Sequence, residues 1–258
     1  MRPGVTGVRC ELGAALLARR DLPTASSARF DLSGLAANTL LHDGHEWKDF
    51  ARTAPAGTRR ALRAAAQEGA SILVRASFAF ARELPSRDPL RSMALAALEC
   101  EAIAREGAVP ACIVRLGYLY GPASRDLLAY RKAFRLGRPY WSGPRGVLQD
   151  HLHLDDAAAA LVAAAKPANA GRLFYATDGR PRSFREFMDH FARRTGRRFP
   201  LHLPRLAKPL MLAVVREEHM QQVEHGMPAR APRPRVPGWR PAHADALAAL
   251  DAIVARWG

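Results

Sequence analysis

Residues 148–165 have the sequence LQDHLHLDDAAAALVAAA, in which a short run of alternating apolar residues passes directly into an alanine-rich stretch. Leu148–Leu154 suits a strand. Asp155 or Asp156 suits the first turn of a helix, because a carboxylate there accepts otherwise unpaired N–H groups. Short apolar runs alternate with Ala-rich stretches along the rest of the chain as well. This alternation predicts an α/β fold with a parallel sheet flanked by helices.

The same periodicity gives the remaining elements. Strands are expected over Ile72–Ala76, Cys112–Leu116 and Leu173–Thr177, and helices over 10–20, 58–69, 92–106, 126–136, 155–165, 183–195 and 243–256. A Pro/Arg-rich stretch, residues 230–241, is expected to form an irregular loop before the last helix. We predict a Rossmann-like unit over residues 1–165 and a smaller C-terminal α/β lobe over 166–258, with the last helix packing back on the body.

Composition narrows the classes of protein. The chain has 258 residues, 48% of them hydrophobic, which is enough for a buried core. It has no uncharged apolar run of about 18 residues, so we expect no membrane partner. The first twenty residues lack the apolar stretch of a signal peptide. The three cysteines have no metal-type spacing, and an odd number favours a reducing, cytoplasmic setting.

The net charge of +15 comes from 39 Lys and Arg against 24 acids, which raises the question of nucleic acid. The arginines are scattered, and no basic helix or aromatic–basic repeat of a nucleic-acid module is present. We therefore interpret the charge as a compositional bias and expect no nucleic-acid partner. An anionic ligand such as a nucleotide phosphate is the alternative.

Several ordered segments resemble the extended short-chain dehydrogenase/reductase family, the NAD-dependent epimerases and dehydratases. They are Gly57–Ser77, Val114–Pro122, Leu148–Ala165, Gly171–Gly179 with Arg182–Arg197, and Gly238–Leu250. The resemblance implies a Rossmann-like sheet, NAD or NADP as cofactor and a nucleotide-sugar or other small polar ligand. It also implies a homodimer through the helices at 58–69 and 92–106.

The catalytic residues of that family are incomplete in this chain. Ser77 matches the family's catalytic serine. The family also has a Tyr-x-x-x-Lys motif, in which the lysine lowers the pKa of the tyrosine for proton transfer. A glutamate follows four residues after that lysine. Aligning that glutamate on Glu101 places Met93 at the tyrosine position and Ala97 at the lysine position, and Ser86–Glu106 contains neither Tyr nor Lys. Ser77 is then either a remnant of the active site or a hydroxyl satisfied at a strand end.

The cofactor-binding start is also altered. Gly4 and Gly7 match the first two glycines of the family's G-x-x-G-x-x-G turn, and the third falls at Cys10. Only Met-Arg-Pro precedes Gly4, so we expect the first strand to be absent. Asp31-Leu32 resembles the segment after the family's third strand, yet only 23 residues separate it from Gly7. We therefore expect at least one further strand to be missing.

The remaining candidate residues carry weaker signals. By resemblance, the substrate pocket includes Arg115, Tyr118, Tyr120 and Asp156. Two clusters have metal-ligating residue types: His42, His45 and Glu46 form the first, and His151, His153 and Asp155 form the second. We assign no metal to either. The first lies in an eroded segment, and the family resemblance explains the second. A serine hydrolase would need a G-x-S-x-G elbow, which Ser77 lacks.

Two hypotheses follow. The chain is an epimerase/dehydratase-like enzyme that works without the usual Tyr/Lys pair, or it is a catalytically inactive relative that acts as a binding, sensing or partner-stabilising protein.

Overall fold

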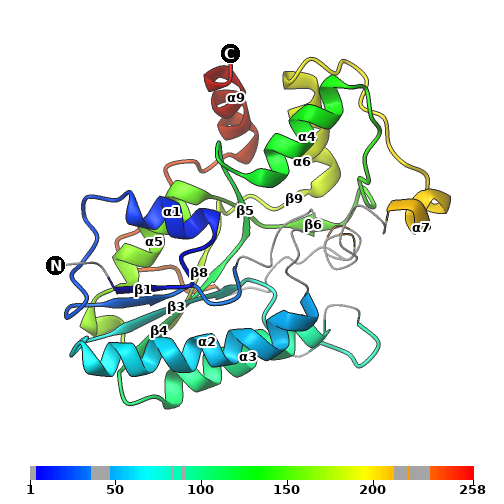
Figure 1. The fold of residues 1–258 in the computed structure, drawn as a ribbon. Coiled ribbons are helices and arrows are strands. Elements are labelled where there is room, and N and C mark those ends of the chain that lie inside the picture. The colour runs from blue at the N-terminus through cyan, green and yellow to red at the C-terminus, as the bar shows by residue number, and fades with distance from the viewer. Residues whose placement is uncertain are drawn as a thin grey trace.

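The computed structural model describes residues 4–35, 47–82, 84–88, 91–211, 220, 223 and 233–258. Its centre is a parallel five-stranded sheet with helices on both faces, which confirms the predicted Rossmann-like α/β class (Figure 1). Across the sheet the strands are β1 (Gly4–Thr6), β2 (Arg29–Asp31), β3 (Leu73–Phe78), β4 (Ala111–Leu116) and β8 (Leu173–Ala176).

Helices form a layer on each face of this sheet. α1 (Glu11–Leu17) and α5 (Leu154–Ala164) lie on one face, and α2 (Trp47–Gln67) and α3 (Arg91–Glu106) lie side by side on the other (Figure 1). The two helices pack against each other, and both carry small buried side chains; these include Ala61, Ala65, Ala94, Ala97 and Ala104. The use of these helices in a dimer stays a prediction.

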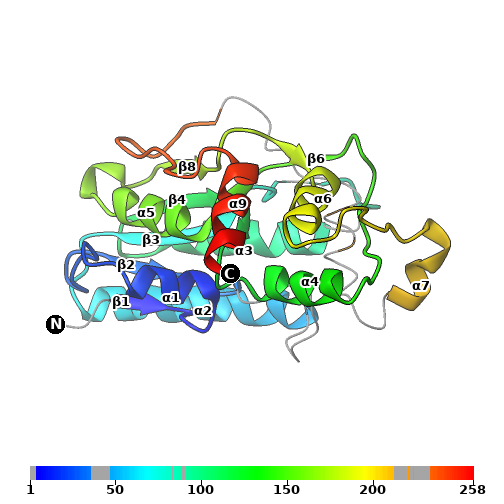
Figure 2. The ribbon, with the colours of Figure 1, turned by 90° about the horizontal axis from the view of Figure 1, so that it is seen from above.

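A second group of helices adjoins the sheet where β4 leads into β5 (Tyr118–Tyr120). It contains α4 (Arg125–Arg135), α6 (Phe184–Arg194) and α9 (Ala246–Arg256), which stand together in Figures 1 and 2. Further short elements complete the chain: β6 (Leu148–Gln149), β7 (His151–His153), β9 (Arg182–Ser183) and α7 (Lys208–Met211).

β5 pairs with β7 and β6 with β9, and α4, α6 and α9 share a separate hydrophobic core that is rich in aromatic side chains. After α4 the chain returns to the sheet with α5 and β8. The division into two units at residue 165 stays a prediction.

The order of the strands is unusual at one edge. In the doubly wound fold the first strand lies in the middle, in the order 3-2-1-4-5-6. Here β1 pairs with β2 alone among the described strands and forms the edge of the sheet. β2 therefore occupies the place of a fourth strand. The described sheet corresponds to the 1-4-5-6 side of the fold, with β8 as one further strand beyond the sixth, and strands two and three are not among the described strands.

The connection between β1 and β2 supports this assignment. The β1–α1–β2 and β2–α2–β3 connections advance in the same direction across the sheet, but α1 and α2 lie on opposite faces (Figure 1). The two connections must therefore have opposite hands, whereas about 98% of such crossovers are right-handed. Direct passage from α1 to a fourth strand produces this arrangement. In the complete fold, strands two and three and their helices come between α1 and the fourth strand, on the other side of the first strand.

Two expectations are corrected here. The first strand is present, as β1, although it is only three residues long. Asp31 does not follow a third strand; it ends β2, where it accepts a hydrogen bond from Arg75 Nη1 at 3.0 Å in a fully buried ion pair. The expectation that at least one strand is missing agrees with the sheet order.

Candidate functional site

The turn after β1 has the shape of a nucleotide-binding turn. Gly7 has φ +78°, and a Cβ there would lie 2.6 Å from the carbonyl carbon of Leu32. A Cβ on Gly13 would lie 2.4 Å from the Val8 oxygen. Gly4 lies within β1, and Gly7, Cys10 and Gly13 follow it with the three-residue spacing of the motif. The cofactor-binding role of Gly4 and Gly7 stays a prediction.

The side chains at this turn are occupied by protein contacts. The Cys10 thiol accepts a hydrogen bond from the Gly13 amide at 3.3 Å and caps α1. Glu11 Oε1 accepts a hydrogen bond from the Arg125 amide at 2.6 Å, which connects the start of α1 to the start of α4. Burial raises the pKa of Glu11, and the bond to Arg125 opposes that shift.

Ser77 belongs to a closed polar network between the sheet and α3. Its hydroxyl donates to Glu101 Oε1 at 2.7 Å. Arg115, opposite Ser77 on β4, donates from Nε and Nη2 to the two oxygens of Glu101, both at 2.8 Å, and from Nη1 to Tyr175 Oη at 2.9 Å. Glu101 and Ser77 are completely buried. The structure thus joins the predicted Ser77 and Arg115 through Glu101. The sequence analysis used Glu101 only to align the Tyr-x-x-x-Lys motif and did not predict this contact.

Met93 and Ala97, where the sequence analysis expects the family's tyrosine and lysine to be replaced, face the core. Met93 is 2% exposed and Ala97 is 0% exposed, and both belong to the main hydrophobic cluster. They contribute apolar packing of α3 against the sheet, and neither side chain carries a group that exchanges a proton.

The other predicted pocket residues serve as packing and docking groups. Tyr118 and Tyr120 pack edge-on against His151, and burial raises the pKa of both phenols. Asp156 accepts hydrogen bonds from the amides of Ala242 and His243 at 2.8 and 2.9 Å. Asp156 therefore fastens the segment that precedes α9 to the start of α5.

Buried polar groups meet at a junction of β7, α6 and the turn that follows β8. The Asp178 amide donates to the His151 carbonyl at 2.8 Å. The ring of His151 stacks on Phe187 with centroids 4.4 Å apart, and neither ring nitrogen has a hydrogen-bond partner within the described ranges. Burial lowers the pKa of His151 to about 3 and raises that of Asp178 to about 6.

Comparison with known proteins gives the same fold. No family model matches the chain. A curated Streptomyces protein, 3-diazoavenalumate denitrifying reductase, is 29% identical over 229 residues, which cover 81% of this chain and 74% of the relative. Human epimerase family protein SDR39U1, solved with NADPH, superposes with a TM-score of 0.72 at 18% identity, covering 99% of both chains. UDP-glucose 4-epimerase of Thermus thermophilus, solved with NAD, has a TM-score of 0.64 at 14% identity, covering 100% and 99%.

The chain has the NAD-dependent epimerase fold. The sequence-based resemblance to extended short-chain dehydrogenases is thereby confirmed for the fold.

The residues of this epimerase fold do not fit a whole nicotinamide dinucleotide. The middle glycine of the turn normally lets the backbone approach the pyrophosphate, and here Cys10 takes that position. The carboxylate of Glu11 adds negative charge at the start of α1. The described sheet also ends at β1, so the strand that normally ends beside the adenosine ribose is not among the described strands.

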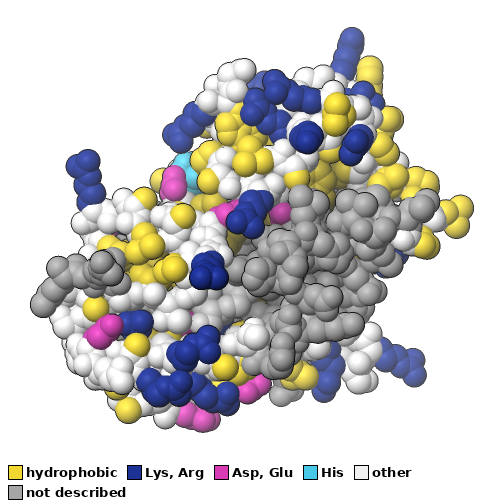
Figure 3. Space-filling model, viewed as in Figure 1, with side chains coloured by type: hydrophobic (Ala, Val, Ile, Leu, Met, Phe, Trp, Pro, Cys, Tyr) yellow, Lys and Arg dark blue, Asp and Glu magenta, His cyan; other side chains and the backbone are white. Residues whose placement is uncertain are grey.

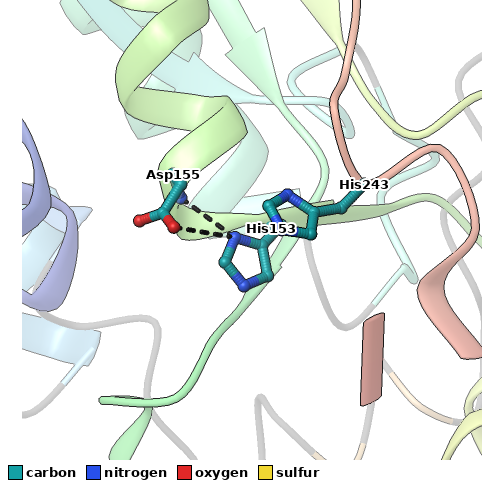
Figure 4. A group of neighbouring side chains, drawn as sticks. All are labelled: His153, Asp155 and His243. Atoms are coloured by element: carbon teal, nitrogen blue, oxygen red, sulfur yellow. Dashed lines mark hydrogen bonds and ion pairs between the residues drawn. The ribbon is translucent and has the colours of Figure 1, made fainter. Parts of the chain in front are cut away.

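A histidine cluster lies where β7 leads into α5, next to the segment that precedes α9. His153, Asp155 and His243 offer ligand atoms within 4.8 Å of one another (Figure 4). The two imidazoles are stacked, 3.8 Å apart at 22°, so their in-plane lone pairs do not converge on one ion. His151, which the sequence grouped with His153, lies apart from this set, and His42, His45 and Glu46 lie outside the described residues.

Proposed function

We propose that this protein is a binding protein on the NAD-dependent epimerase fold that does not catalyse tyrosine-dependent hydride transfer. The observation that carries the proposal is the burial of Met93 and Ala97 together with the engagement of the Ser77 hydroxyl by Glu101. A proton shuttle contributes about 10²–10⁴-fold to catalysis, and only when its groups reach the reacting atoms. None of these three side chains is free to do so.

The ligand class we propose is a small polar molecule, such as a nucleotide sugar, held at the junction of β7, α6 and the turn that follows β8. Buried polar atoms without a protein partner require water or a ligand. His151 and Asp178 contribute three such atoms at this junction, counted among the described residues. Solved proteins of the same fold support the class, since MoeE5 was solved with UDP-glucose and NAD at a TM-score of 0.62 and 17% identity.

Cofactor binding tests the loss of hydride chemistry. We expect NADH and NADPH to bind with a dissociation constant above about 100 µM, because micromolar affinity corresponds to about −8 kcal/mol and depends on a held pyrophosphate. Loose binding through the basic surface should disappear at high salt. Tight, salt-resistant binding of NADPH in a nicotinamide fluorescence titration would overturn the proposal.

A reductase is the second candidate, favoured by the name of the Streptomyces relative. Reductive loss of a diazo group breaks a carbon–nitrogen bond, releases N2 and forms a carbon–hydrogen bond with a hydride from an external donor. No oxyanion needs a proton in this step, so the missing tyrosine does not count against it. Consumption of NADPH with stoichiometric N2 release from an aryl diazonium substrate would establish this function instead.

A further inference from the structure

The carboxyl-terminal ends of α4 and α6 lie together at the top of Figure 1 and continue as parallel segments. The Tyr140 amide donates to the Leu201 carbonyl at 2.9 Å. A Cβ on Gly137 would lie 3.3 Å from Arg197 Nη1. Residues 137–140 therefore lie beside residues 197–201, and Arg135 and Leu136 directly precede them.

Large apolar side chains stand out from this surface. Phe199 is 72% exposed, Leu136 is 59% exposed and Leu201 is 47% exposed. Scattered exposed hydrophobics are common, but a contiguous group of large ones marks an interaction site. Figure 3 shows hydrophobic side chains among dark-blue Lys and Arg side chains in this part of the molecule.

The same surface is basic and lacks acids. Residues 127–149 and 190–204 contain no Asp or Glu, and their cations are Arg131, Lys132, Arg135, Arg138, Arg145, Arg193, Arg194, Arg197 and Arg198. Two nearby acids come from other parts of the chain. Asp189 is engaged by Tyr140 and His202, and Asp251 by His190 and Arg194. Neither neutralises the exposed Arg135, Arg138 or Arg198 through an ion pair within the described structure.

We propose that this docking surface, formed by Arg135, Leu136, Arg138, Arg198, Phe199 and Leu201, binds the surface of an anionic lipid bilayer. Arginines beside protruding Phe and Leu are the composition of proteins that lie in the headgroup region, where cations meet acidic lipids and apolar groups reach the acyl boundary. Arg198 lies 5.3 Å from the centroid of the Phe199 ring, which places a cation against this aromatic anchor.

Attachment of this kind lies on the membrane and does not cross it. Within the described part of the chain, no helix has the length and apolar character of a transmembrane span. The sequence-based expectation of no membrane partner rested on that criterion alone and did not address a surface contact. The inference is independent of whether the protein binds a cofactor.

Co-sedimentation of the full chain with vesicles tests the inference. We expect binding to phosphatidylcholine vesicles that contain phosphatidylglycerol and little binding to phosphatidylcholine alone. Phe199→Ser with Leu136→Ser should weaken binding by about tenfold or more, since each removes an exposed apolar side chain that the bilayer would bury. Arg135→Glu with Arg198→Glu should weaken it by at least about fivefold for each arginine.

The matched controls are Leu17→Ser and Arg63→Glu, which change exposed residues on α1 and α2, away from the docking surface. Each should leave vesicle binding within about twofold of the unmodified chain, well short of the fivefold expected for one docking-surface arginine. Circular dichroism confirms that every variant is folded. Absence of binding to anionic vesicles, equal binding to neutral ones, or equal losses from control and docking-surface variants would each overturn the proposal.

Discussion

Replacing Glu101 with alanine should destabilise the protein strongly, because this carboxylate is the centre of the network that also holds Ser77 and Arg115. The substitution removes three charge-assisted hydrogen bonds of 2.7–2.8 Å. It leaves the Arg115 guanidinium, whose side chain is 11% exposed, with the Tyr175 hydroxyl as its remaining hydrogen-bond partner within the described structure. Removing one partner of a buried ion pair costs about 3–5 kcal/mol.

That loss is large against a total stability of about 5–15 kcal/mol for a typical native protein. With about 2–4 °C for each kcal/mol in a chain of this size class, the melting temperature should fall by about 10 °C. Urea unfolding followed by circular dichroism measures the free energy directly.

A double-mutant cycle with Arg115→Met separates the pair from the packing. The double variant should be less destabilised than the sum of the two single variants, with a coupling energy of about 0.5–3 kcal/mol. Ser77→Ala should cost about 1.5–3 kcal/mol, since it deletes a hydrogen bond to a charged group. If Glu101→Ala changes the free energy of unfolding by less than about 0.5 kcal/mol, the change is within the range of an ordinary surface substitution and the assignment of a structural role to this network is refuted.

Three other predictions follow from the same structure. Met93→Tyr with Ala97→Lys should yield no NAD(P)H turnover and should lower stability by about 1–3 kcal/mol for each buried unpaired group, as measured by absorbance assays and thermal melts. Burial lowers the folded-state pKa of His151 from its ordinary value of 6.5 to about 3, so the imidazole stays neutral in the fold and lowers stability as the pH falls from 6.5 towards 3. His151→Phe should therefore reduce the loss of stability at acid pH in urea unfolding, and an unchanged loss would contradict the shift. The paired α2 and α3 should form a dimer surface, so Leu95→Glu, at a position 38% exposed, should convert a dimer seen by light scattering into monomer, whereas a monomeric unmodified chain would disprove it.

The long elements were predictable because their periodicity is strong. The helices at 92–106, 126–136 and 183–195 match α3, α4 and α6 closely. α2 begins at Trp47, earlier than predicted, because the structure accommodates Pro55 within the helix. The predicted strand Leu148–Leu154 is divided into β6 and β7, which pair with different partners.

The short elements and the polar network were beyond sequence reasoning. β1 and β2 have three residues each, too few to show a period, so the sequence does not reveal that Gly4 lies within a strand. Glu101 meets Ser77 across 24 positions in the chain, on a helix that packs beneath a strand. The available signal was the position of Glu101 in an alanine-rich, mostly apolar stretch. An acid on an apolar helix face is rarely buried without a partner, so Glu101 indicated an ion pair.

The direct passage from α1 to β2 also identifies a place for protein engineering. The connecting loop, residues 18–28, carries exposed residues such as Arg20, Asp21 and Ser27 and lies beside the open edge of the sheet. Exposed loop tips are where domain insertions and circular permutation succeed most often. A strand–helix–strand module transplanted into this loop would extend the sheet at β1. Gain of dinucleotide binding by such a chimera would show that the missing strands, more than Cys10 or Glu11, set the ligand size this chain accepts.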